Sequence, residues 1–168
     1  MERLQLGLAV TVLFFCPQGK TMATDMTDRG RYLLLKYAFD AESVPSTYKM
    51  KLVTDASVTK ATDTFSSLSE CPNGSGYTTG GIDLTASNFT VSEVDGTVSA
   101  KAEVADNLAQ WTATGTFPAS GTGVTFLVIT DNTGSDNVLG FIDLGGAQTM
   151  TEDGVLTVND IEFQVNAS

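Results

Sequence analysis

Oxygen ligands gather in the segment TDNTGSDN, which covers residues 130–137. It holds Asp131, Asn132, Asp136 and Asn137. Carboxylate and amide oxygens are hard ligands that suit calcium. The spacing does not match an EF-hand loop, however, and no glutamate follows where a bidentate ligand is needed. We therefore favour a solvated turn between two strands over a metal site, and keep Asp131 and Asp136 as the calcium candidates.

A second acidic group lies near the C-terminus, in TEDGVLTVNDIE, with Glu152, Asp153 and Asp160. A pair of carboxylates could hydrolyse a glycoside. Such sites usually add several aromatic residues as a sugar platform, and here the one Trp, four Tyr and nine Phe are spread thinly. The chain has no histidine, which removes the commonest general base and every triad built on it. We expect no enzymatic activity, no catalytic residue and no cofactor.

The charge of the chain is strongly acidic and unevenly distributed. The formal net charge is -11, and no basic residue follows Lys101. Binding of nucleic acid needs a surface of lysine and arginine that releases counterions from phosphates, and the C-terminal part cannot supply one. We expect no direct nucleic-acid partner. An acidic surface keeps the protein soluble and could meet a basic partner.

The N-terminal residues 1–26 are expected to form an arm that precedes the folded domain, 27–168. Arg3 is followed by an apolar run, Leu4 to Phe15, that is too short to span a bilayer, so we expect no membrane partner. Three interpretations stay open: a secretory signal, a start placed upstream of Met22 or Met26, and an arm that packs on a neighbouring subunit. In the third, Leu13, Phe14 and Phe15 are docking candidates. Cys16 and Cys71 lie in very different contexts, and we expect unpaired thiols.

The segment TDRGRYLLLKYAFDAES predicts a helix over residues 28–40. Thr27 and Asp28 can cap it, and Pro45 ends any helix before it. Apolar residues recur at helical spacing: Leu33, Leu34, Tyr37 and Ala38. Three basic residues fall largely on the other side: Arg29, Arg31 and Lys36. This basic side is a candidate docking surface, although such a helix more often simply covers the end of a β-sandwich.

From Tyr48 onward the period changes to two, which is typical of strands with one buried face. A long polar connection follows the first strand, with turn signals at Asn73-Gly74 and Gly80-Gly81. Strands are then expected at 82–85, 88–94, 97–104, 108–114, 123–130, 137–144, 155–159 and 161–166. About eight strands with no helix between them predict a mainly β fold, an antiparallel β-sandwich of jelly-roll type with one short N-terminal helix.

Trp111 and the segment VTFLVIT mark the expected centre of the fold. We expect VTFLVIT to be a mostly buried strand that pairs with VLGFIDLG through the turn DNTGSDN. Trp111 is expected to anchor the core rather than to hold a ligand.

Several of these segments together resemble a class of small virion structural proteins of tailed bacteriophages. The segments are DRGRYLLLKYAFDAESVPSTYKMKLVT, LSECPNGSGYTTGGIDLT, WTATGTFPASGTGVTFLVITDN and VLGFIDLGGAQTMTEDGVLTV. Residues 27–165 match this class in order: a short helix, a strand, a compact NGYxxGG turn, a WTAxG…PASG hairpin and a final acidic hairpin. The chain departs from it at Ser75-Gly76-Tyr77, where the compact turn would have NGY.

The resemblance implies an accessory particle protein without catalytic residues. It implies a capsid decoration, or cement, protein on the exterior of the virion, with the major capsid protein and copies of itself as partners. A neck, tail or fibre component is the alternative within the particle. A secreted bacterial adhesin or carbohydrate-binding module is the alternative from a different class, and calcium-dependent binding through Asp131 and Asp136 would favour it.

Overall fold

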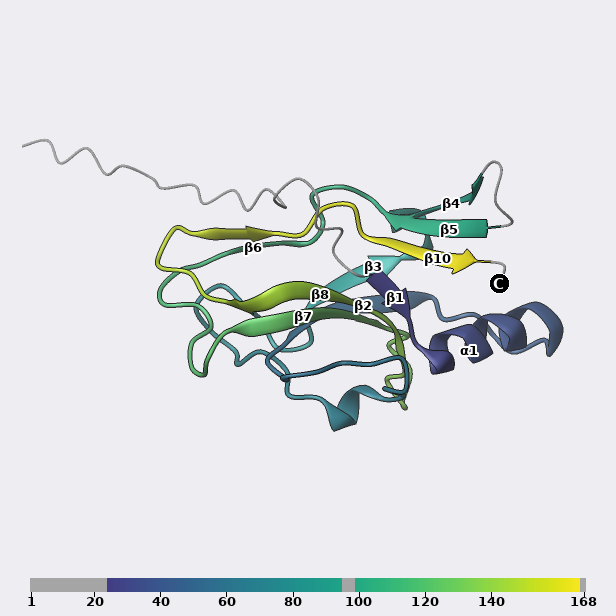
Figure 1. The fold of residues 1–168 in the computed structure, drawn as a ribbon, viewed down its shortest axis with the longest axis horizontal. Coiled ribbons are helices and arrows are strands. Elements are labelled where there is room, and N and C mark those ends of the chain that lie inside the picture. Colours follow the sequence, from purple (N-terminus) through teal and green to yellow (C-terminus); the bar gives the residue numbers. More distant parts are fainter. Residues whose placement is uncertain (1–23, 95–98, 167–168) are drawn as a thin grey trace, which may run out of the picture.

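The computed structural model describes residues 24–94 and 99–166, and its strands form three antiparallel sheets (Figure 1). The five-stranded sheet has the order β1-β8-β7-β2-β3. Its strands are β1 (Thr24–Met26), β8 (Val138–Gln148), β7 (Val124–Thr130), β2 (Thr47–Val53) and β3 (Ile82–Thr85). The helix α1 (Asp28–Phe39) separates β1 from β2 in the chain.

The second layer consists of two smaller sheets. One has the order β10-β5-β4, with β4 (Phe89–Val94), β5 (Ser99–Val104) and β10 (Glu162–Asn166). The other pairs β6 (Gln110–Thr112) with β9 (Val155–Thr157). Two short 3-10 helices, η1 (Phe65–Ser67) and η2 (Ala86–Asn88), lie in connections. The main core is shared by the two layers: Leu52, Leu127 and Ile142 of the large sheet pack with Val104, Trp111 and Phe163 of the small ones.

The strand VTFLVIT is apolar throughout because both of its faces are covered. Leu127 and Ile129 belong to the main core, and Phe126 and Val128 belong to a second cluster on the other face of the large sheet. The long connection 54–81 covers that second face with Val58, Phe65 and Leu68. A strand buried on both faces loses the alternation of polar and apolar residues that marks a half-buried strand.

The expected mainly β, antiparallel class is confirmed, and so are the short helix and the pairing of β7 with β8. Trp111 is 5% exposed and lies opposite Leu156, which confirms its place in the core. The expected strand 108–114 is reduced to Gln110–Thr112, and residues 97 and 98 of another expected strand lie outside the described residues. The jelly-roll form of the sandwich stays a prediction.

Residues 24–26 were expected in the N-terminal arm and instead form β1. They pair with β8, with Asp25 opposite Phe141 and Met26 opposite Gly140. A strand of three residues is too short to show a period in the sequence, so only its pairing reveals it. The described domain therefore begins before the expected boundary at residue 27.

A buried tyrosine holds the long connection onto β2. The Tyr77 hydroxyl, on a residue 2% exposed, donates to Glu70 Oε1 at 2.7 Å and accepts from Leu52 N at 3.3 Å. Glu70 Oε1 also accepts from Gly80 N at 2.6 Å. The next residue, Gly81, has φ +71, and a Cβ there would meet Met50 O at 2.1 Å. The turn therefore closes directly on the β2 backbone.

Burial, with the hydrogen bond to Glu70 second, raises the pKa of Tyr77 well above its ordinary 10.0. The folded state therefore favours the neutral phenol, and its contribution to stability is present below pH 10 and lost as the pH rises above that value. We expect Tyr77→Phe to unfold about 1–2 kcal/mol more easily at pH 7, since Leu52 N loses its acceptor. The same variant should lose less stability than the wild type between pH 9 and about pH 11.

Urea unfolding at a series of pH values, followed by Trp111 fluorescence, measures both effects. Burial also raises the pKa of the Cys71 thiol, to about 12, but that contribution is common to both proteins. Equal alkaline slopes for wild type and Tyr77→Phe would contradict the assignment.

Candidate docking surface

The helix α1 begins at a well-formed cap. Thr27 is extended, and its hydroxyl accepts from Gly30 N at 2.9 Å. This contact satisfies one of the four backbone donors that every helix leaves free at its start. Asp28 in the first turn and Lys36 in the last turn complement the helix dipole. The helix ends at Phe39, where Asp40 N donates to Lys36 O at 2.9 Å.

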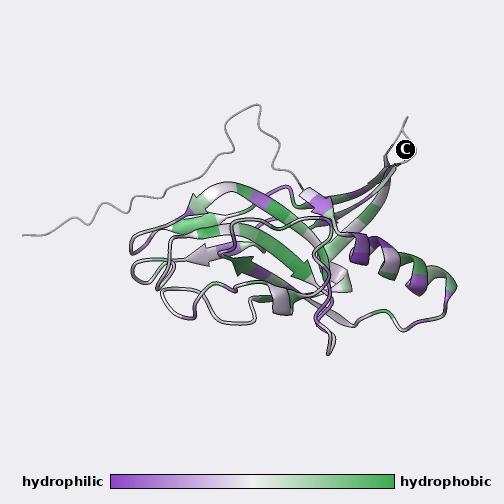
Figure 2. Ribbon diagram, turned by 60° about the horizontal axis from the view of Figure 1, so that its bottom comes forward, coloured by the Kyte–Doolittle hydropathy of each residue, from purple (hydrophilic) through white to green (hydrophobic). Residues whose placement is uncertain are grey.

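The first turn of α1 is fixed to the body of the protein. Thr27 N donates to Leu139 O at 3.1 Å, and the Thr27 hydroxyl donates to Val138 O. Asp28 N donates to Lys60 O at 2.8 Å. Gly30 lies so close to β8 that a Cβ would stand 2.1 Å from Leu139 O. Beyond this turn the helix leaves the edge of the sandwich and projects past it (Figures 1 and 2).

Gly30→Ala tests this close approach. Alanine alone would favour the helix by about 1 kcal/mol. The clash with a backbone carbonyl must move the helix off β8, so we expect a net loss of about 1–3 kcal/mol in the free energy of unfolding. Gly134→Ala is the matched control, because a Cβ at Gly134 meets nothing within 4 Å. Urea unfolding of both variants decides the point: a Gly30→Ala protein as stable as the wild type would show that the helix is not held there.

The side of α1 that faces solvent carries three large apolar residues, beside the exposed and charged Asp28 and Arg31. Tyr32 is 50% exposed, Leu35 60% and Phe39 85%. Their spacing of i, i+3 and i+7 places them on one side of the helix, and we call these three residues the outward stripe. The opposite side carries Gly30 and Leu33, which are buried. The helix therefore has an inner side that packs on the body and an outer side on which these three apolar residues meet solvent.

The three basic docking candidates are held by partners within the protein. Arg29 Nε donates to Asn137 Oδ1 at 2.9 Å, and its guanidinium lies 5.3 Å from the centre of the Tyr32 ring. Arg31 pairs with Asp25 at 3.2 Å and with Asp28 at 3.3 Å.

Lys36 is placed in a similar way, beside the outward stripe. It pairs with Glu42, whose hydrogen bond raises the pKa of Lys36, and lies 5.7 Å from the Tyr32 ring. Arg29 and Lys36 thus both lie against Tyr32, on the same flank of the stripe. The other docking candidates, Leu13, Phe14 and Phe15, lie outside the described residues.

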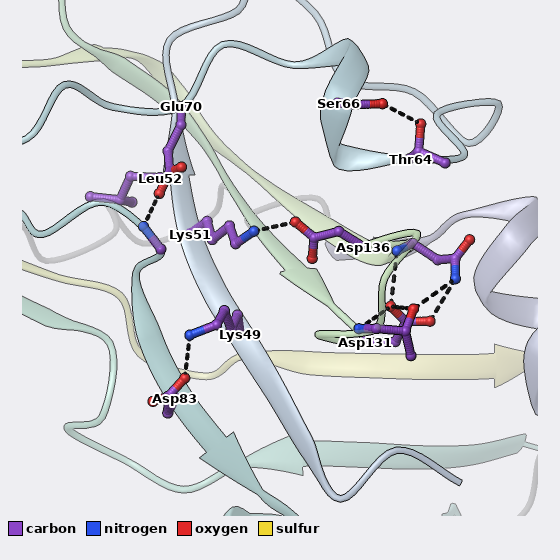
Figure 3. A network of polar contacts seen from close by, with 12 residues as sticks. Lys49, Lys51, Leu52, Thr64, Ser66, Glu70, Asp83, Asp131 and Asp136 are labelled. Carbon is purple, nitrogen blue, oxygen red and sulfur yellow. Dashed lines mark hydrogen bonds and ion pairs between the residues drawn. The ribbon is translucent and has the colours of Figure 1, made fainter. Parts of the chain in front are cut away.

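The loop between β7 and β8 uses its acidic oxygens to organise itself (Figure 3). Asp131 is 1% exposed, and its carboxylate accepts from Asn137 N at 2.9 Å and Asn137 Nδ2 at 2.6 Å. It also accepts from Thr133 N at 3.2 Å and Thr133 Oγ1 at 2.8 Å. Since Asn137 Oδ1 receives Arg29 Nε, a continuous chain of hydrogen bonds joins this loop to α1.

The second calcium candidate is engaged elsewhere. Asp136 pairs with the buried Lys51 (Figure 3). The Lys51 ammonium also lies 3.9 Å from the centre of the Phe65 ring. Asp131 and Asp136 therefore turn to different partners and do not converge. No group of three or more metal-ligating acidic, histidine or cysteine side chains occurs in the part of the chain that the structure describes.

The C-terminal acidic residues lie in turns. Glu152 and Asp153 are exposed before β9, and Asp160 is exposed before β10. Asp153 and Asp160 have positive φ values of 67 and 54, a conformation that aspartate tolerates in turns. None of the helices in the described ranges has the length and apolarity of a membrane span.

No family model, curated protein or solved structure matches the chain.

Sequence reasoning did not find the outward stripe. It placed Leu34 and Ala38 on the packed side, but Leu34 is 47% exposed and Ala38 is also exposed. The signal was present as the spacing of Tyr32, Leu35 and Phe39. This spacing was hard to recognise because three leucines, Leu33 to Leu35, are consecutive. They point in three directions around the helix, so the sequence does not show which of them faces the core.

Proposed function

We propose that this chain is a non-enzymatic structural protein of a tailed-bacteriophage virion, and that it decorates the outside of the head shell. The observation that carries the proposal is the outward stripe on a projecting helix whose first turn is fixed to the sandwich. Large apolar side chains that gather on one exposed side of a helix favour a site of protein–protein contact. The partners would be the major capsid protein and other copies of this chain.

The resemblance of residues 27–165 to small virion structural proteins supports the same assignment. It rests on turn and core segments, including the helix that carries the stripe. A stable sandwich with a projecting docking element suits a protein whose role is to hold others together.

Decoration has a clear physical purpose in a shell filled with DNA. Packaged DNA pushes outward, so a protein clamped across neighbouring capsomers would stabilise the shell at several joints at once. The net charge of -11 keeps the unbound chain soluble and away from the phosphates of the genome.

Two alternatives would use the same molecule differently. A neck, tail or fibre component could dock through the same stripe, but in far fewer copies per particle. A secreted adhesin or carbohydrate-binding module with calcium in the loop 130–137 is less favoured, because the Asp131 and Asp136 carboxylates already bind donors of the protein.

The test is to purify particles from the native source on a density gradient and quantify the chain by mass spectrometry. Decoration predicts a fixed ratio to the major capsid protein, close to one copy of this chain for each capsid subunit or small group of subunits. A handful of copies per particle would replace decoration by a neck or tail role. A chain cut near residues 21–24 and found in a supernatant free of particles would overturn the virion assignment.

A further inference from the structure

We propose that Lys51 and Asp136 form an isopeptide bond, an amide that joins Lys51 Nζ to Asp136 Cγ with loss of one water. The two side chains point toward each other and form an ion pair between β2 and the turn that precedes β8 (Figure 3). The inference goes beyond the proposed function and does not depend on it, so its test needs only the free chain.

The end of the Lys51 side chain lies among apolar groups. Lys51 is 5% exposed, and its ammonium lies 3.9 Å from the centre of the Phe65 ring. The strand register places it on the same face of the large sheet as Val53 and Val128, which belong to the second cluster. An ion pair in such surroundings gives up most of its hydration, and its attraction repays that cost only where further hydrogen bonds satisfy both ions.

The Asp136 carboxylate lacks those further hydrogen bonds. Its Oδ2 faces the Lys51 ammonium, but its Oδ1 is buried and has no hydrogen-bond partner among the described residues. A buried carboxylate oxygen without a donor is costly, and a neutral amide oxygen in the same place costs less. The amide would therefore remove both charges from the apolar site and leave Oδ1 as an uncharged carbonyl oxygen.

The condensation balances within the pair. One proton passes from Nζ to the carboxylate, which turns the two ions into an amine and a carboxylic acid. The amine lone pair attacks Cγ, the N–C bond forms, and the Cγ–Oδ2 bond breaks. Oδ2 leaves as water with the proton of the acid and a second proton from the amine, so no other reactant is needed.

The geometry favours this reaction in two ways. Reacting groups that a fold holds in contact behave as if present at effective molarities of up to about 10⁸ M. The Asp136 side chain is 29% exposed, so the released water has a way out to solvent. The Lys51 amine stays on the buried side, away from competing water.

A second lysine–aspartate pair on the same strand provides an internal comparison. Lys49 Nζ of β2 lies 2.5 Å from Asp83 Oδ1 of β3 (Figure 3). The Asp83 side chain is 70% exposed, so water stabilises both charges and the pair stays ionic. We expect no bond between Lys49 and Asp83. Contact alone therefore does not single out Lys51 and Asp136; contact within an apolar site does.

The bond would fasten distant parts of the chain to each other. Lys51 and Asp136 are 85 positions apart, and the ring that their bond closes contains every strand from β3 to β7. A cross-link of this length restricts the unfolded chain strongly. Unlike a disulfide, an amide also survives reducing agents, so we expect the link to persist in the denatured and reduced protein.

The intact mass of the full chain, denatured and reduced, tests the bond directly. The N-terminus is first read by fragmentation of the same sample. We expect the folded wild type to be lighter than its sequence by one water, and its digest to contain a branched peptide that joins position 51 to position 136. The branched peptide is needed because a succinimide at an aspartate also loses one water but joins no second segment.

Three variants locate the lost water. Lys51→Met keeps a long side chain beside Phe65 and should have the full mass of its sequence, as should Asp136→Ala. Lys49→Met is the matched control and should still lack one water. A wild type at full mass, shown to be folded by Trp111 fluorescence, would overturn the bond, and so would a loss of water that persists in Lys51→Met. Absence of the chain from particles would overturn the proposed function and leave a measured bond standing.

Discussion

Asp131→Ala is expected to lower the free energy of unfolding by about 3 kcal/mol or more, because buried donors lose their acceptor. Asn137 is 5% exposed, and both its backbone N–H and its side-chain amide donate to the Asp131 carboxylate, at 2.9 Å and 2.6 Å. Because Asn137 is buried, its donors would be left without an acceptor once the Asp131 carboxylate is removed. The loss is large against a typical total stability of about 5–15 kcal/mol.

The same substitution should loosen α1. Asn137 receives Arg29 Nε at 2.9 Å, so a displaced Asn137 removes one of the contacts that fix the helix. We expect amide hydrogens of α1 to exchange faster in Asp131→Ala than in the wild type, measured by mass spectrometry.

Asp143→Ala is the matched control for this prediction. Asp143 is exposed and accepts one hydrogen bond, from Gly145 N at 2.8 Å, so its loss should cost about 1 kcal/mol or less. If Asp131→Ala costs no more than Asp143→Ala in urea unfolding, the account of the loop is wrong. A marked rise in the unfolding temperature of the wild type on adding calcium would also contradict it, since it would mean that these oxygens hold a metal.

Leu35→Asp should have the largest effect on assembly. Its side chain is 60% exposed, so its replacement should change the free energy of unfolding by no more than about 0.5 kcal/mol. At the centre of an interface, however, a buried and unpaired carboxylate is strongly unfavourable. We expect at least about a hundredfold weaker binding to particles, measured as the fraction of added protein that sediments with them.

Val91→Asp serves as the control, because it adds the same charge at a residue that is 74% exposed on β4. It should bind particles like the wild type. Equal binding by Leu35→Asp, Val91→Asp and the wild type would place the docking surface elsewhere on the chain.

The fold was predictable where a single strong pattern decided it. VTFLVIT and VLGFIDLG are long apolar runs joined by a turn, and they form the paired strands β7 and β8. Thr27 and Asp28 predicted the start of α1 because capping is a local interaction between neighbouring residues. β1 escaped prediction because three residues carry no period, and its existence depends on β8, more than a hundred residues away in the chain.

The candidate site was less predictable, for a related reason. Arg29, Arg31 and Lys36 are conspicuous in the sequence, but which charges remain available depends on Asp25, Asn137 and Glu42, which only the fold brings near. Three consecutive leucines leave the orientation of a helix undecided. The close contact of Gly30 with Leu139 decides it, and that contact turns Tyr32, Leu35 and Phe39 toward solvent.

Under the proposed function, the outward stripe is covered when the chain joins a particle. Hydroxyl-radical footprinting of the free chain and of purified particles measures this directly, because Tyr32, Leu35 and Phe39 all react readily when exposed. We expect these three residues to be oxidised readily in the free chain and to be protected in the particle. Oxidation of all three at the same rate in both states would contradict it.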